Sequence, residues 1–307
     1  MDKKFSLKLF FSADLIGSTA LKSNAEGVTL EPPWLETFQG FYSEFPVIFK
    51  NEQDKLGCKP IDFWKGIGDE LLWVTTLTKG DDALSSLRAF KLSLEEYNRR
   101  LDTTGKKVRL KGTAWIAGFP ITHREVPLPN TEKKEVDYIG PYIDTGFRLS
   151  KFASQMKMVV SVDLAWLILN CRVKSSEENN LVLRFDESES MKGVLNSKPY
   201  PIIWIKCDSP LEELEYDLHH RENHNANWRT SLEKFCEAFI TATDDKIIFP
   251  YIIDDDVFGK SPHKSYEEWC KKNQEPAEMN DEEQFVDSKY ELAGNLNENI
   301  KFVKAEW

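Results

Sequence analysis

The sequence lacks long hydrophobic runs and has few cysteines. No apolar stretch reaches the roughly 20 residues that a membrane-spanning helix needs. Residues 1–4 lead directly into a strand-like segment, so we expect neither a signal peptide nor membrane attachment. The 5 cysteines are odd in number and scattered, which favours reduced thiols in a cytoplasmic protein over a disulfide framework or a zinc site.

The sequence also lacks the excess of basic charge that a general nucleic-acid binder needs. Its formal net charge is -11, so broad neutralisation of phosphates is not expected. A nucleotide site is not excluded, because it needs only a local cluster of side chains and metal ions. The composition, 41% hydrophobic and 30% charged with 19 Phe and 9 Trp, predicts a globular protein with a large core.

The periodicity of apolar residues predicts an α+β chain. Strands are expected at 5–13, 61–63, 71–74, 108–119, 158–162, 181–185 and 200–205, and helices at 32–48, 80–101, 138–153 and 163–170. Residues 120–134 are expected to form a polar loop. A central hairpin implies antiparallel pairing, and we expect one sheet with helices on one face. The composition changes near residue 208, which predicts a main domain at 1–207 and an acidic, partly helical extension at 208–307.

Two acidic residues are expected at the ends of neighbouring strands. The first strand ends at Asp14, and a tight turn with Gly66 and Gly68 places Asp69 near a hairpin tip. Two carboxylates placed in this way could bind one or two Mg²⁺ ions against a triphosphate. The alternative is that Asp14 caps a helix and Asp69 is only a turn residue.

A short polar segment follows the first acid. Gly17, Ser18 and Thr19 come just after Asp14, and their backbone N–H groups at the start of a helix could cradle phosphate oxygens. No Gly-x-Ser-x-Gly elbow and no P-loop is present in the sequence.

Several motifs in order resemble the class III nucleotidyl cyclases over about residues 5–206. The matching segments are Phe11-x-x-Asp14-Leu15-x-Gly17-Ser18-Thr19, Lys65-x-x-Gly68-Asp69-Glu70, Asp137-Tyr138-x-Gly140, Arg148-Leu149, Val159-x-Ser161 and Lys192-Gly193. The chain is most similar to the bacterial pyrimidine cyclases of Pycsar anti-phage defence. This resemblance implies a ferredoxin-like, antiparallel-containing sheet, a catalytic domain at 1–207, and a cyclic nucleotide product that acts on a separate effector protein.

The resemblance also implies roles for single residues. Asp14, the Leu15 carbonyl and Asp69 would bind two Mg²⁺ or Mn²⁺ ions, and Arg148 would stabilise charge in the transition state. Asp144 departs from the family, which usually has Asn four residues before this arginine. An ionised Asp cannot donate a hydrogen bond, so its contact with the ribose is in question.

Lys65 and Asp137 align with the pair that reads the base in adenylyl cyclases. A lysine donor and a carboxylate acceptor can satisfy adenine, cytosine or uracil, so these residues do not select among the bases. The resemblance favours UTP, with CTP and ATP as alternatives. It further implies a homodimer in which one subunit gives Asp14 and Asp69 to a site and its partner gives Lys65, Asp137 and Arg148.

Two other interpretations stay open. One is a diguanylate cyclase, because Gly68-Asp69-Glu70 lies in a hairpin, although Ile67 and Leu71 break the pattern of that family. The other is a catalytically inactive cyclase domain that binds a nucleotide or a partner as a sensor, which Asp144 favours and the two metal-binding acids oppose.

Overall fold

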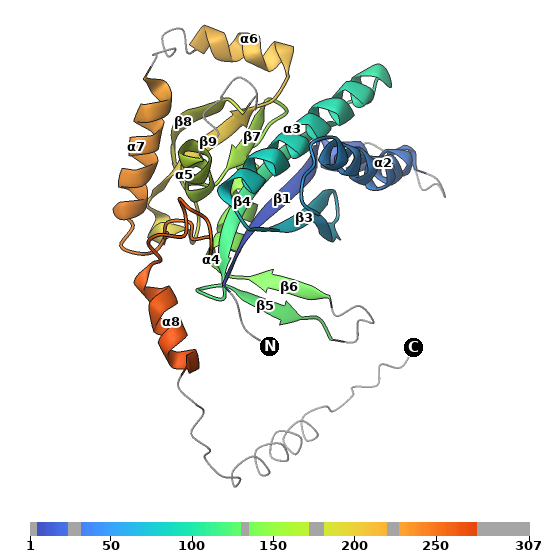
Figure 1. Cartoon of the computed structure of the whole chain (residues 1–307). Helices are drawn as coiled ribbons and strands as arrows, with labels where there is room; N and C mark the ends of the chain where they lie inside the picture. Colours follow the sequence, from blue (N-terminus) through green and yellow to red (C-terminus); the bar gives the residue numbers. More distant parts are fainter. Residues whose placement is uncertain (1–4, 24–31, 130–134, 172–180, 220–226, 275–307) are drawn as a thin grey trace, which may run out of the picture. The chain divides into compact units, whose positions relative to one another are not determined.

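The fold is seen in a computed structural model of the chain, which describes residues 5–23, 32–129, 135–171, 181–219 and 227–274 (Figure 1). The chain divides into two units, residues 1–266 and 267–307, and the sites discussed below lie in the first. No helix in the described ranges combines the length and the apolar character needed to cross a bilayer.

The first unit is built on a seven-stranded sheet with one parallel pair. The strands are, in spatial order, β2 (Asp62–Ile67), β3 (Glu70–Leu77), β1 (Ser6–Ile16), β4 (Arg109–Phe119), β7 (Lys157–Val160), β9 (Pro199–Lys206) and β8 (Leu183–Ser190). β4 and β7 run parallel, and every other neighbouring pair in this sheet is antiparallel. The predicted α+β class and the predicted central hairpin are confirmed.

Three helices cover one face of the sheet. They are α2 (Pro33–Lys55), α3 (Gly80–Thr103) and α5 (Val162–Asn170), and Figure 1 shows α3 lying across β1 and β4. Phe11 of β1 points to this face, where its ring packs against Phe49 of α2 and Phe90 of α3. α2 continues through Pro46 to its end, and its aromatic stripe is a core face as predicted.

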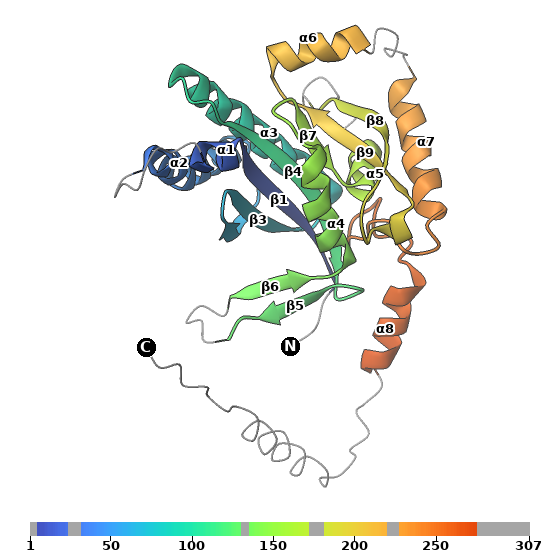
Figure 2. The ribbon, with the colours of Figure 1, turned by 180° about the vertical axis from the view of Figure 1, so that it is seen from behind.

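The prediction that helices lie on one face only is wrong. α4 (Pro141–Leu149) crosses the opposite face beside β4 (Figure 2). It can approach closely because Gly146 faces Trp115, where a Cβ atom would lie 2.1 Å from the indole ring. A second, two-stranded sheet, β5 (Arg124–Pro127) and β6 (Val136–Ile139), joins this side. The predicted loop at 120–134 is therefore partly a strand, and residues 130–134 lie outside the described residues.

The remaining helices are α1 (Ser18–Ser23), α6 (Pro210–His219), α7 (Trp228–Thr241) and α8 (Lys264–Gln274). α7 contacts α5 and buries Leu232, Cys236 and Ile240. The described residues between 208 and 266 therefore pack with the preceding elements in one compact unit. The division of function at residue 207 stays a prediction.

Candidate active site

The polar end of the sheet face opposite α2 and α3 carries the first predicted acid. Side chains alternate along β1, so Phe10, Ser12 and Asp14 point to the same face. The strand register places Asp14 opposite Glu70 of β3 and opposite Lys111 of β4. An apolar cluster around Phe10 thus ends in a group of charged residues drawn from three adjacent strands.

Direct contacts tie this group together. Lys111 Nζ lies 3.2 Å from Asp14 Oδ2 and donates a 2.9 Å hydrogen bond to the Ser150 carbonyl oxygen. The Ser12 hydroxyl donates to the Glu70 carboxylate. Lys111 and Asp14 are both largely shielded, with side chains 17% and 23% exposed, so their attraction is screened less than that of a surface pair.

The acids of this group are shifted toward their protonated forms. Burial raises the pKa of Asp14, Lys111 opposes that shift, and the nearby charge of Asp69 adds to it. Burial also raises the pKa of Glu70, against the hydrogen bond from Ser12 and together with the charge of Asp14. Negative charge is thus concentrated here, and a bound cation would relieve it.

The second predicted acid, Asp69, sits in a turn that is held by its surroundings. Gly68 has a φ of +64°, a region that favours glycine, and its carbonyl oxygen accepts a 2.8 Å hydrogen bond from Tyr42 Oη. The Leu15 backbone N–H donates to the Asp69 carbonyl oxygen at 3.2 Å, and the Ser18 hydroxyl donates to its carboxylate. Asp69 is thereby fixed next to the end of β1, as the sequence predicted.

Gly66 has a different role from the one predicted. It lies within β2 and its φ is not positive, so it does not shape the turn. Its lack of a side chain instead makes room for Tyr42, because a Cβ atom there would lie 2.9 Å from Tyr42 Oη. Gly66 therefore supports the Asp69 turn through the hydroxyl that binds Gly68.

The predicted phosphate cradle is only partly available. Gly17 leads into α1, a helix of 6 residues, and Thr19 is exposed. Ser18 is 3% exposed and its hydroxyl is engaged by Asp69. Ser18 thus holds the acid directly, which leaves Gly17 and Thr19 as the parts of this segment that face solvent.

Lys65 and Asp137 come together within one chain. Lys65 Nζ lies 2.6 Å from Asp137 Oδ1, and both side chains are 33% exposed. The pairing of β2 with β3 shifts between Phe63 and Lys65, and this bulge places Lys65 opposite Leu72. Lys65 Nζ also lies 4.3 Å from the centre of the Trp64 ring. The predicted base-reading pair is adjacent and accessible.

Arg148 and Asp144 lie one turn apart on α4, and both are exposed. Arg148 Nε donates a 2.6 Å hydrogen bond to the Lys192 carbonyl oxygen, and Nη1 donates at 2.9 Å to the backbone carbonyl of Asp144. The segment between β8 and β9 therefore positions the arginine. Asp144 acts on Arg148 through its backbone.

Four residues at the site were not predicted: Ser12, Tyr42, Glu70 and Lys111. Ser12 and Lys111 follow from side-chain alternation once the strand register is known, and a single sequence does not give that register. Among the described residues, no group of three or more His, Cys, Asp or Glu side chains is arranged to hold a metal ion. Asp14 and Asp69 would therefore need backbone or substrate oxygens to complete a coordination shell.

The chain matches no protein-family model and no curated protein. Among solved structures, it is similar to the adenylyl cyclase CyaB from P. aeruginosa, at 15% identity and a TM-score of 0.49 over 68% of this chain and 97% of that one. It is also similar to the guanylate cyclase domain of RhGC from Catenaria anguillulae, at 13% identity and a TM-score of 0.47 over 67% and 100% of the two chains. A bacterial light-regulated adenylyl cyclase follows at 10% identity and a TM-score of 0.44, over 66% and 91%. Likenesses this distant do not identify an activity.

Proposed function

We propose that the protein is a nucleotide cyclase that converts a nucleoside triphosphate into a 3′,5′-cyclic monophosphate and pyrophosphate. The observation that carries this proposal is the pair of acids, Asp14 and Asp69, held side by side at the end of β1 and in the β2–β3 turn. Two adjacent carboxylates from one subunit, together with an accessible base-reading pair from its partner, would supply what metal-assisted cyclisation of a triphosphate requires.

The side chains present fit a divalent metal ion. Asp14, Asp69 and the Leu15 carbonyl would hold Mg²⁺ or Mn²⁺, two ions per site, since hard cations prefer oxygen ligands. Burial raises the pKa of Asp14, and the nearby charge of Asp69 adds to that shift, which is an electrostatic condition that a cation relieves. When bound, the ions would lower the pKa of the ribose 3′-hydroxyl and neutralise the triphosphate.

The reaction requires few side chains beyond these acids. The 3′-oxygen forms a bond to the α-phosphorus, the bond from that phosphorus to the β-phosphate breaks, and the hydroxyl proton passes to solvent as pyrophosphate leaves. Arg148 would lie against the α-phosphate and stabilise the charge that develops there. Its two hydrogen bonds, to Lys192 and Asp144, set the direction of the guanidinium before substrate arrives.

The preferred substrate in this proposal is UTP. The preference comes from the sequence resemblance to the pyrimidine cyclases of anti-phage defence, in which the product activates a separate effector. The ion pair of Lys65 and Asp137 supports base reading in general, because it presents a donor and an acceptor together. CTP and ATP satisfy the same two groups.

We place the complete site at the interface of a homodimer. One subunit would supply Asp14 and Asp69, and its partner would supply Lys65, Asp137 and Arg148. An isologous dimer built in this way has two equivalent sites.

Product analysis tests the proposal directly. The protein is incubated with each of the four ribonucleoside triphosphates and Mg²⁺ or Mn²⁺, and products are resolved by mass spectrometry. We expect a cyclic mononucleotide, mainly cUMP, and none from Asp14→Asn or Asp69→Asn. A cyclic dinucleotide would indicate a diguanylate cyclase instead. Turnover of ATP alone would remove the pyrimidine preference and leave the reaction class intact.

A second candidate function is a nucleotide-binding sensor without turnover. The observation in its favour is Lys111, whose ammonium group already lies beside Asp14 where a metal ion would bind. Binding of a triphosphate by calorimetry, with no product in either metal, would favour this function over catalysis.

A further inference from the structure

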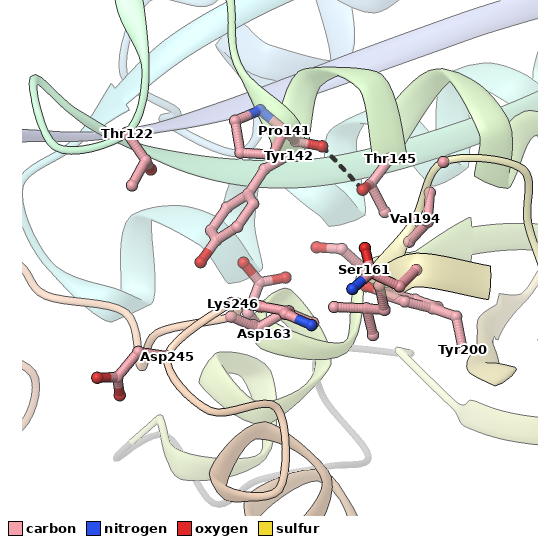
Figure 3. A pocket seen from close by; sticks show the side chains of 14 residues that line it. Thr122, Pro141, Tyr142, Thr145, Ser161, Asp163, Val194, Tyr200, Asp245 and Lys246 are labelled. Atoms are coloured by element: carbon pink, nitrogen blue, oxygen red, sulfur yellow. Dashed lines mark hydrogen bonds between the residues drawn. The ribbon is translucent and has the colours of Figure 1, made fainter. Parts of the chain in front are cut away.

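A cavity of about 280 Å³ lies in the first unit, between α4, the start of α5 and the β8–β9 connection (Figure 3). The loop after α7, at residues 245–247, completes its wall. The polar side chains that line it include Tyr142, Thr145, Ser161, Asp163, Tyr200 and Lys246. The volume approaches that of small-molecule sites, and none of these residues belongs to the site described above.

Asp163 is the unusual member of this wall. Its side chain is buried, at 4% exposure, and the Leu164 N–H donates a 3.0 Å hydrogen bond to Oδ1, while the Ser161 hydroxyl lies close enough to the same carboxyl to lower its pKa against the larger effect of burial. Within the described part of the chain, no Lys, Arg or His side chain forms an ion pair with it. An ionised carboxyl buried without a paired counter-charge is costly, and Lys246, which also lines the cavity, forms no ion pair with Asp163 among the described residues.

Three hydroxyl groups surround the same space. The Tyr200 hydroxyl accepts a 2.9 Å hydrogen bond from the Val162 N–H, and the Tyr142 hydroxyl accepts one of 2.8 Å from the Ile248 N–H. The charge of Asp163 adds to burial in raising the pKa of both tyrosines, so both rings lie near it. Ser161 Oγ is buried and has no hydrogen-bond partner of good geometry among the described residues.

The neighbouring acid, Asp245, is not part of this arrangement. Its carboxylate pairs with His263 at 3.2 Å and with Lys264 at 2.8 Å. Figure 3 shows its side chain apart from Ser161 and Tyr200, at the outer side of the loop. Of these two acids, Asp163 is therefore the one that is buried and has no ion-pair partner among the described residues.

We propose that this cavity binds a small organic cation, an amine or amidine with a compact apolar body, anchored by the Asp163 carboxylate. The ammonium or amidinium group supplies the missing counter-charge and donates hydrogen bonds to Asp163 and Ser161. The rings of Tyr142 and Tyr200 flank the cation with their apolar faces, a setting in which cations are stabilised by aromatic rings. The cavity is a second ligand site, separate from the triphosphate site.

A ligand in this cavity would touch the elements that hold Arg148. Tyr142 and Thr145 belong to α4, which carries Arg148, and Gly193 follows Lys192, whose carbonyl oxygen accepts from Arg148 Nε. The cation is therefore an effector that adjusts the position of this arginine. This second step rests on the proposed function, whereas binding itself does not.

Calorimetric titration of the full chain with benzamidine and agmatine tests the binding. Benzamide, which has nearly the shape of benzamidine without its charge, is the matched neutral probe. We expect both cations to bind the wild type. Their affinity for Asp163→Asn should be at least about tenfold lower, because that variant loses a hydrogen bond between charged groups. Asp245→Asn is the control, because the Asp245 carboxylate pairs with His263 and Lys264. This variant should bind both cations as tightly as the wild type does.

Thr145→Phe, which fills the cavity from α4, gives an independent variant if Asp163→Asn does not fold, and it should also abolish binding. Equal affinity for benzamide and benzamidine, unchanged binding by Asp163→Asn or by Thr145→Phe, or no binding of either cation would overturn the proposal. Where the wild type also cyclises a triphosphate, benzamidine should change kcat, and the change should be lost in Asp163→Asn. Failure of cyclisation leaves the calorimetric result unaffected.

Discussion

Lys111 of β4 is bound to Asp14 of β1, with 3.2 Å between Nζ and Oδ2. The same ammonium group reaches the carbonyl oxygen of Ser150, the residue that follows α4. One lysine thus balances the charge of a proposed metal ligand and links it to the end of the helix that carries Arg148. Two opposing effects on activity follow, because Lys111 competes with a metal ion and also fixes the site.

Replacement of Lys111 separates these effects. In Lys111→Met, Asp14 has no competing cation, so we expect tighter Mn²⁺ binding by calorimetry and half-maximal activity at a lower metal concentration. The loss of a part-buried hydrogen bond to Ser150 and of the ion pair with Asp14 should cost about 1 kcal/mol in the free energy of unfolding, measured in urea.

Lys157→Met is the matched control for this variant. Lys157 of β7 pairs with Asp186 at 2.5 Å, and the two side chains are 25% and 23% exposed, close to the values for Lys111 and Asp14. It should lower stability similarly without changing metal binding. Weaker Mn²⁺ binding in Lys111→Met would contradict the competition and would make the lysine solely a positioning residue.

The ion pair of Lys65 and Asp137 predicts a substrate effect with little effect on stability. Because both side chains are one-third exposed, Lys65→Ala should change the free energy of unfolding by less than about 1 kcal/mol. The KM for the preferred triphosphate should rise by about tenfold or more, and preference among bases should weaken. Steady-state kinetics with all four triphosphates measures both.

Lys8→Ala is the comparison for this prediction. Lys8 of β1 pairs with Glu125 at 3.1 Å and lies over the Tyr138 ring, so it is another strand lysine bound to the β5–β6 hairpin. It should leave KM and base preference unchanged. If Lys65→Ala and Lys8→Ala behave alike, Lys65 does not read the base.

Sequence patterns predicted the parts of this site that depend on local structure. Turn chemistry placed Asp69 beside the end of β1, and helical periodicity placed Asp144 and Arg148 on one helix. What could not be predicted depends on pairing between distant segments. The bulge beside Lys65 arises from the register of β2 with β3. That register depends on how the whole strands pair and cannot be read from the residues next to Lys65.

The position of α4 shows the same limit at the level of the fold. Its apolar residues predicted a helix but not which sheet face it covers. That choice depends on the fit of Gly146 to Trp115, a contact between segments about thirty residues apart in the sequence. Strand β5, which was not predicted, likewise forms through its pairing with β6. Its own four residues are all exposed and give no hydrophobic pattern.

Composite sites predict complementation between inactive chains. Asp69→Ala removes an acid from one half-site and Arg148→Ala removes the arginine from the other, so their heterodimer keeps one intact site. Random mixing of subunits should restore about a quarter of wild-type activity, because half of the dimers are heterodimers with one of two sites working. A mixture of Asp69→Ala and Asp14→Ala damages the same half-site in both chains and should stay inactive. Sites contained within one subunit would give no recovery in either mixture.

The buried carboxyl of Asp163 predicts a pH dependence of stability with a defined sign. Burial raises its pKa to about 6, against a usual value of 3.8, so the folded protein binds more protons than the unfolded chain between these values. This group therefore lowers the free energy of unfolding as pH rises from about 4 to 6, and its effect is constant above that.

In Asp163→Asn the side chain stays neutral, so the free energy of unfolding should not fall with rising pH on account of this residue. The difference in unfolding free energy between variant and wild type should shift in favour of the variant by about 2 kcal/mol from pH 4.5 to 7.5. The titratable groups near Asp163 include Tyr142, Tyr200 and Cys236, and burial raises the pKa of each of them, so they stay protonated over this range. Urea unfolding at the two pH values measures the shift, with Asp245→Asn as the exposed control. A constant difference would show that Asp163 is already ionised and stabilised at pH 4.5, which requires a cationic partner in the purified protein.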